Sequence, residues 1–234
     1  MPAQWRDRGE AGLTSGEGAA PVRWRVGRAE LPLHHQDRCL VDNRLGLFGV
    51  FDGVGAYARS GEAAALAADT VAQRCALEIT DPLLAIAAAL QEADQLIGEL
   101  GLGATTATVA WVRGAQLLYA SVGDSRLYHQ PRGGSMRQVS VDEGEGRMLF
   151  NALGSERLRA LDEVVPQRGS LAVGSGDKVL LVTDGITGDH PPDLLSVSDL
   201  AAAVMGEDPQ QGAQRLVQVA RKHDDRSALV LFLE

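Results

Sequence analysis

Aspartates recur at the ends of apolar runs in this chain, and they are the residues whose type and spacing could do chemistry. Four follow or precede a predicted buried strand and one stands at the start of the first predicted hairpin: Asp52, Asp184, Asp124, Asp224 and Asp37. Several carboxylates without His or Cys beside most of them suit a hard cation held by oxygen ligands. The pattern therefore indicates Mg²⁺ or Mn²⁺ rather than Zn²⁺.

Each of these aspartates also has an ordinary structural interpretation. Asp-Gly is among the commonest hairpin turns, and Asp before a helix or strand is a common cap. The combination of four or five in one small domain favours a metal site, and Gly53 can offer a closely approaching backbone carbonyl. The residues alone leave both interpretations open.

The elements that must position these aspartates are predicted from apolar periodicity. Helical spacing predicts two long helices, 60–79 capped by Ser60 and 82–100 capped by Asp81. The other predicted elements are a strand near 22–26, a hairpin over 38–52, strands at 107–112, 116–122, 125–129, 136–141, 179–183 and 227–233, and helices at 200–204 and 212–221.

The short connections between these strands predict the fold class, because they can join only antiparallel neighbours. We expect one α+β domain over residues 22–234, with mainly antiparallel sheet and helices inserted in two blocks. Residues 1–21 are rich in Gly, Ala and Ser in their second half, without apolar periodicity, and we expect a flexible leader there.

Composition excludes several classes of protein. The 234 residues carry a formal net charge of −9, which repels a nucleic-acid backbone or an anionic membrane surface. No run of apolar residues reaches the length of a membrane span, and two cysteines are too few for a disulfide framework or a zinc cluster. We expect a monomeric cytoplasmic protein that binds neither nucleic acid nor membrane.

Five short motifs, in a fixed order along the chain, resemble those of one protein family. They are Phe-Asp-Gly-x-Gly at 51–55, Gly-Asp-Ser-Arg at 123–126, Ala-Leu-Gly at 152–154, Thr-Asp-Gly at 183–185 and Asp-Asp-Arg-Ser at 224–227. Together they are similar to the signature of the metal-dependent Ser/Thr protein phosphatases of the protein phosphatase 2C (PPM) type, in the bacterial form with a short flap. The resemblance implies a four-layer α/β/β/α sandwich of two mainly antiparallel sheets flanked by helices.

The resemblance also implies roles for single residues. Asp52 would bridge two Mn²⁺ or Mg²⁺ ions, the carbonyl of Gly53 would help hold one of them, and Asp184 and Asp224 would complete the ligands of the other. Asp37 would lie in or just behind this shell. The paired ions of such a site activate water for direct attack on phosphorus, so that no phosphoenzyme is required.

Three further residues take supporting roles by the same resemblance. Asp124 matches the ligand of a third, weaker ion in bacterial members. Arg126 would orient acidic ligands from behind the metal shell. Asp225 is the neighbour of a ligand, and its own role stays open.

One departure from the family pattern bears on activity. Pro32 stands five residues before Asp37, at the position where the family usually has an Arg that binds the substrate phosphate. Arg28, Arg38 and Arg59 are the nearby candidates to replace that Arg. The segment that would form the flap, 141–150, is also short.

Two functions follow. The first is an enzyme that hydrolyses phosphoserine and phosphothreonine in proteins, opposing a Ser/Thr kinase. The second is a catalytically weak, phosphatase-like binding or regulatory protein, suggested by Pro32 and the short flap. The retained aspartates favour the enzyme, because a scaffold has no physical need to hold several repelling carboxylates together. A metal-dependent nuclease is disfavoured by the net charge.

Overall fold

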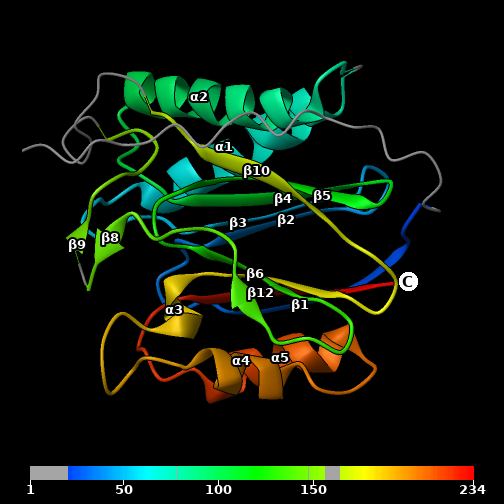
Figure 1. The fold of residues 1–234 in the computed structure, drawn as a ribbon. Coiled ribbons are helices and arrows are strands. Elements are labelled where there is room, and N and C mark those ends of the chain that lie inside the picture. The colour runs from blue at the N-terminus through cyan, green and yellow to red at the C-terminus, as the bar shows by residue number, and fades with distance from the viewer. Residues whose placement is uncertain (1–20, 78, 147, 156–163) are drawn as a thin grey trace, which may run out of the picture.

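Two antiparallel sheets lie face to face in the computed structural model, which describes residues 21–77, 79–146, 148–155 and 164–234 (Figure 1). Residues 1–20, most of the expected leader, lie outside the described residues. The strand order of the first sheet is β1 (Trp24–Leu31), β12 (Arg226–Leu233), β11 (Lys178–Val182), β6 (Arg126–Gln130) and β7 (Arg137–Gln138). The strand order of the second is β10 (Gln167–Ala172), β5 (Gln116–Val122), β4 (Ala107–Arg113), β3 (Leu47–Phe51) and β2 (Arg38–Asp42).

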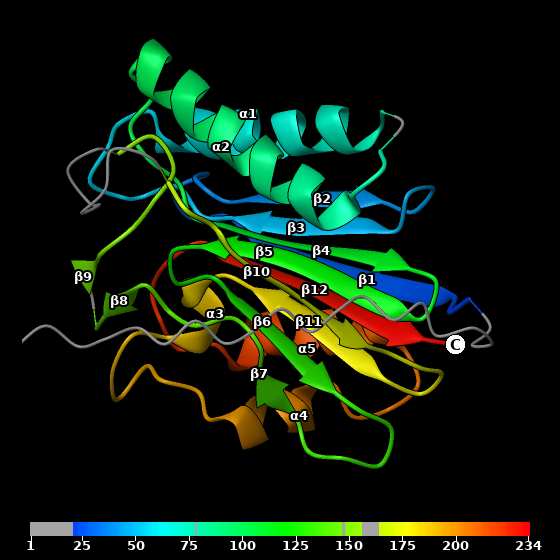
Figure 2. The ribbon, with the colours of Figure 1, turned by 45° about the horizontal axis from the view of Figure 1, so that its top comes forward.

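Helices cover the outer face of each sheet, as Figure 2 shows from a second direction. The second sheet is covered by α1 (Ser60–Cys75) and α2 (Pro82–Leu100), and the first by α4 (Val197–Ala203) and α5 (Pro209–Val219). Buried apolar residues form one cluster under α1 and α2 around Val71 and Trp111, and another under α4 and α5 around Leu200. A third fills the space between the sheets and includes Phe48 and Leu231. The expected four-layer α/β/β/α sandwich is confirmed.

The prediction for α2 is confirmed at both ends. The Asp81 side chain accepts a hydrogen bond from the Leu84 backbone N–H at 3.0 Å, and Pro82 occupies the first turn, where its missing N–H costs nothing. Gly101 ends the helix in the left-handed conformation at φ +61°. The predicted cap of α1 is wrong: Arg59 holds the N-cap position, and Ser60 is the first helical residue. Its Oγ instead accepts a hydrogen bond from Gln36 at 2.8 Å.

Four elements were not predicted from periodicity. Strand β10 is an edge strand whose residues alternate between half-buried and exposed, and Arg168 and Gly169 obscure that pattern in the sequence. Helix α3 (Asp184–Thr187) is a single turn after β11. The flap segment forms a short hairpin of β8 (Gly144–Glu145) and β9 (Met148–Leu149), at the end of the sheets where α3 lies (Figure 1). Within the described ranges, no helix combines the length and the apolar character needed to cross a membrane.

Candidate metal centre

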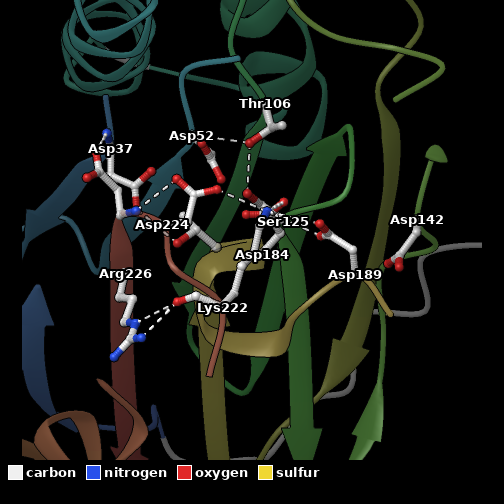
Figure 3. A network of polar contacts seen from close by, with 12 residues as sticks. Asp37, Asp52, Thr106, Ser125, Asp142, Asp184, Asp189, Lys222, Asp224 and Arg226 are labelled. Carbon is white, nitrogen blue, oxygen red and sulfur yellow. Dashed lines mark hydrogen bonds and ion pairs between the residues drawn. The ribbon is translucent and has the colours of Figure 1, made fainter. Parts of the chain in front are cut away.

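A cavity of about 510 Å³ opens at one end of the two sheets, and all of the predicted metal ligands except Asp37 line it. Asp52 directly follows β3 of the second sheet, and Asp124 lies in the turn between β5 and β6. Asp184 begins α3, which follows β11, and Asp224 lies shortly before β12. Strands β11 and β12 both belong to the first sheet. Figure 3 shows Asp52, Asp184 and Asp224 close together, although 172 residues separate the first from the last in the chain, as their numbers 52 and 224 give.

The backbone around Asp52 is held by two threonines that directly precede β4, the neighbouring strand. Thr106 donates its N–H to the Asp52 carbonyl at 2.8 Å, and its Oγ1 accepts the Asp52 N–H at 3.2 Å. Thr105 Oγ1 donates to the same carbonyl at 2.9 Å. At Gly53, a Cβ would lie 2.7 Å from the backbone carbonyl of Ser60, so only glycine lets α1 begin this close to the site.

Gly185 brings the two acidic motifs of the first sheet together. A Cβ at this position would lie 1.8 Å from the carbonyl oxygen of Asp225, a distance that no side chain tolerates. The contact places Asp184, at the start of α3, beside the loop that carries Asp224 and Asp225. The glycine of the Thr-Asp-Gly motif is therefore required by packing, whatever its neighbour does chemically.

Asp225 has a clear structural role, which the sequence left open. Its carboxylate accepts hydrogen bonds from four backbone N–H groups: Leu33, His34 and Gln36 at 2.5 Å each, and Asp37 at 3.3 Å. Burial acts to raise the pKa of Asp225, but these four donors lower it below its ordinary value. Asp225 thereby fixes the loop before β2 and positions Asp37.

Asp37 reaches the same centre from that loop. One carboxylate oxygen, Oδ2, accepts a hydrogen bond from Thr183 Oγ1 at 2.9 Å. Thr183 in turn accepts the Ser227 N–H at 3.1 Å, which links Asp37 to both β11 and β12. Asp37 therefore stands behind the cavity and does not line it.

Arg126 holds an acidic residue of the flap segment that is not among the predicted metal ligands. Its guanidinium makes a two-pronged contact with Asp142, with Nη2 at 2.6 Å and Nε at 2.9 Å from Oδ2. Asp142 and Arg126 line a smaller hollow together with Asp124 and Asp184. In the same segment, Glu143 accepts the Gly123 N–H at 2.8 Å and so ties the flap to the turn that carries Asp124.

The carboxylates repel one another strongly. Burial raises the pKa of Asp52 well above its ordinary value, and Asp37, Asp184, Asp124 and Asp224 raise it further. Burial likewise raises the pKa of Asp37 to about 7 and, with Asp184, the pKa of Asp124 to about 7. Bound positive charge would relieve this repulsion and favour the ionised carboxylates.

Two oxygens in the centre are free to take a cation. Among the described residues, neither Asp37 Oδ1 nor Asp184 Oδ1 has a hydrogen-bond partner, although both atoms are buried. Buried carboxylate oxygens without donors suit the all-oxygen coordination of Mg²⁺ or Mn²⁺. Within the described part of the chain, no three acidic, His or Cys side chains surround one point closely enough to hold an ion together. An ammonium group lies among them instead.

That ammonium belongs to Lys222, which the sequence analysis missed together with Asp189. Lys222 Nζ contacts Asp184 Oδ2, and it lies 3.0 Å from Asp224 Oδ2 and 3.2 Å from Asp189 Oδ2 (Figure 3). Burial acts to lower the pKa of Lys222, but the carboxylates, Asp184 first, raise it above its ordinary value. The available signals were a lysine two residues before Asp224 and an aspartate five residues after Asp184, both next to recognised motifs.

The arginines considered as phosphate ligands point elsewhere. The described residues that line the cavity do not include Arg28, Arg38 or Arg59. On β1, Arg28 pairs with Glu30, with Nε 2.7 Å from Oε2. Arg38 donates to the Asp37 carbonyl at 2.7 Å, and Arg59 pairs with a glutamate of α1 at 2.8 Å.

The raised pKa values predict how the stability of the metal-free protein depends on pH. Asp37 and Asp124 titrate at about 7 in the folded state but near 3.8 when unfolded, so between these values the folded state binds more protons. The stability that protonation of these two carboxyls gives the folded state is therefore lost as the pH rises toward 7. In EDTA we expect the free energy of unfolding to be lower at pH 8 than at pH 5.5, by on the order of 1–3 kcal/mol.

Urea denaturation in EDTA at the two pH values measures this difference. Saturating Mg²⁺ should reverse the trend, because an ion binds the deprotonated carboxylates. Greater stability at pH 8 than at pH 5.5 in EDTA would show that the carboxylates are not mutually repelling as described.

Comparison with known proteins supports one family. The sequence model of the family described as Protein phosphatase 2C matches residues 31–221. A curated relative from Arabidopsis thaliana, probable protein phosphatase 2C 17, is 30% identical over 228 residues, with 81% of this chain and 78% of the relative covered. The family model covers every acidic motif except the last, Asp224 to Ser227, and all the residues that line the cavity before Lys222.

Solved structures share the fold. The PPM Ser-Thr phosphatase MsPP from Mycobacterium smegmatis, in complex with cacodylate, is 25% identical with a TM-score of 0.73, covering 92% of this chain and 100% of that one. The catalytic domain of the serine threonine protein phosphatase PstP, in complex with two manganese ions, is 21% identical with a TM-score of 0.77, covering 91% and 99%. The chain thus belongs to the protein phosphatase 2C family and is a metal-dependent serine/threonine protein phosphatase.

Proposed function

We propose that the cavity at Asp52 is the active site of this phosphatase and that Asp52, Asp184 and Asp224 hold its catalytic ions. The observation that carries the proposal is the convergence of these aspartates from both sheets on one cavity, where one buried oxygen of Asp184 has no hydrogen-bond donor among the described residues. The order of the motifs along the chain supports the same ligand set.

The chain's own residues would hold two ions, Mn²⁺ or Mg²⁺, from both sheets. Asp52, with the Gly53 carbonyl beside it, would contribute from the second sheet, and Asp184 and Asp224 from the first. Asp124 would contribute to a third ion. When bound, such ions activate water and neutralise phosphoryl oxygens.

Other residues keep this arrangement in place and shape the cavity. Thr105 and Thr106 restrain the Asp52 backbone, and Asp225 restrains the loop of Asp37. Val54 and Leu149, the latter in the flap hairpin, add apolar surface to the cavity wall. The chain thus supplies rigid ligands and a partly enclosed space of about 510 Å³ for a phosphorylated side chain.

Three finer statements belong to the same proposal. The substrate is a phosphorylated protein whose phosphoserine or phosphothreonine was placed by a Ser/Thr kinase. Residues 22–234 act as one catalytic domain in a monomer. The protein works in the cytoplasm, which suits its two free cysteines, since a reducing compartment keeps thiols unpaired.

Phosphate release from a phosphothreonine peptide tests the function directly. We expect turnover with Mn²⁺ or Mg²⁺ and a loss of at least about 100-fold in excess EDTA, since the nucleophile is then not activated. Adding the ion back should restore the rate, which controls for unfolding. Turnover that persists in EDTA would rule out a metal-dependent reaction, and ion binding without turnover on any phosphopeptide would point to a binding protein.

A further inference from the structure

Lys222 occupies an unusual place for a basic residue, at the centre of the acidic cluster. Its Nζ contacts carboxylates on three different segments: Asp184 at the start of α3, Asp189 in the loop after α3, and Asp224 before β12 (Figure 3). The Lys222 side chain is only 17% exposed. Among the described residues that line the cavity, it is the one Lys or Arg.

Hydrogen bonds fix the backbone of Lys222, whereas its side chain is able to move. The guanidinium of Arg226 donates to the Lys222 carbonyl, at 2.7 Å from Nη2 and 3.2 Å from Nε. These contacts hold the backbone at the base of β12. The four-carbon side chain borders the open cavity, so the ammonium can leave the carboxylates without any backbone movement.

The contacts of Lys222 coincide with the proposed ligand set. Asp184 and Asp224 are two of the residues assigned to the ions, and the oxygens that face Lys222 are Oδ2 in both. An ammonium and a divalent ion cannot occupy the same position between these oxygens, since both are cations that need close oxygen contact. Binding of one therefore opposes binding of the other.

We propose that Lys222 is a tethered cation that occupies one ion position in the metal-free enzyme and must be released when a divalent ion binds there. The inference rests on the proposed ligand set. The ammonium neutralises the cluster in the absence of metal, which keeps the carboxylates together. The same contact lowers the apparent affinity for the ion, because only the fraction of molecules with Lys222 released can bind it.

The chemical reactivity of the lysines in the wild-type protein tests the exchange. Lys222 and Lys178 are the only two lysines in the sequence, and Lys178 contacts the Val204 carbonyl at 2.8 Å under α4, so it serves as an internal reference. We expect acetic anhydride to modify Lys222 slowly in EDTA and at least fivefold faster in saturating Mg²⁺, as measured by mass spectrometry of peptides. The rate at Lys178 should not change.

Two results of this experiment have distinct meanings. If Mg²⁺ binds, as calorimetry would show, but Lys222 reacts no faster, the ion does not displace the ammonium and the inference is wrong. If no divalent ion binds at all, the ligand set itself is wrong, and the proposed function fails with it.

Lys222→Met provides the second measurement, with Lys178→Met as the matched control. We expect the first variant to bind Mn²⁺ at least tenfold more tightly at one site, measured by titration calorimetry, and to unfold at a lower temperature than the wild type in EDTA. Lys178→Met should leave the Mn²⁺ affinity unchanged. If Lys222→Met bound Mn²⁺ with the wild-type affinity, the inference would be overturned. If that variant failed to fold, the reactivity of the lysines in the wild-type protein would be the test of the inference.

Discussion

Replacing Asp52 by Asn is expected to reduce phosphatase turnover by more than about 100-fold at saturating Mn²⁺. Changing a residue that only orients a metal ligand already lowers metal affinity or activity by about 10- to 100-fold. Asp52 is itself the proposed ligand of both ions, so its loss should cost more. The same change should stabilise the metal-free protein, because burial and four neighbouring carboxylates raise the pKa of Asp52. Phosphopeptide turnover and thermal unfolding in EDTA measure the two effects.

Asp124→Asn is the comparison for this variant. Asp124 lies in the same cavity but is assigned to a third ion, so its loss should reduce turnover clearly less than Asp52→Asn does. Equal damage from the two changes would be inconsistent with separate roles. An Asp52→Asn enzyme that keeps more than a tenth of the wild-type rate would show that Asp52 is not the shared ligand.

Gly185→Ala is expected to destabilise the protein by about 3 kcal/mol, near the upper end of the usual cost of overpacking. The added Cβ would lie 1.8 Å from the Asp225 carbonyl oxygen. Because the clash is with backbone atoms, no flexible side chain can move aside to relieve it. Separating the two segments would also displace Asp184 from Asp224. Turnover should therefore fall even at temperatures where the variant stays folded.

Gly98→Ala serves as the control for a glycine in a helix. Beyond its chain neighbours and the backbone of its own helix, no atom of the described residues lies within 4 Å of a Cβ built at Gly98 in α2, and the helical backbone suits alanine. We expect a gain of about 0.5–1 kcal/mol and unchanged turnover. Urea denaturation compares both variants with the wild type. If Gly185→Ala proved as stable as the wild type, the close approach of α3 to Asp225 would be disproved.

Local sequence was sufficient for much of the fold. The cap at Asp81, the apolar spacing of α2 and the left-handed Gly101 are all local signals, and they predicted that helix correctly at both ends. Ser60 was misassigned as a cap because its hydroxyl has a competing partner, Gln36, which lies 24 residues away. Strand β10 was missed because an edge strand with one half-buried face carries little apolar periodicity.

The sequence by itself determined the family, the order of the acidic motifs and the type of ion that the aspartates suit. These follow from residue types and short spacings, which the chain carries without its fold. Only the tertiary structure decided which neighbours the aspartates have: Asp225 as the acceptor of four backbone N–H groups and Lys222 as the cation among the carboxylates. Such contacts depend on how two sheets meet in space, because the partners of Asp225 lie about 190 residues away along the chain.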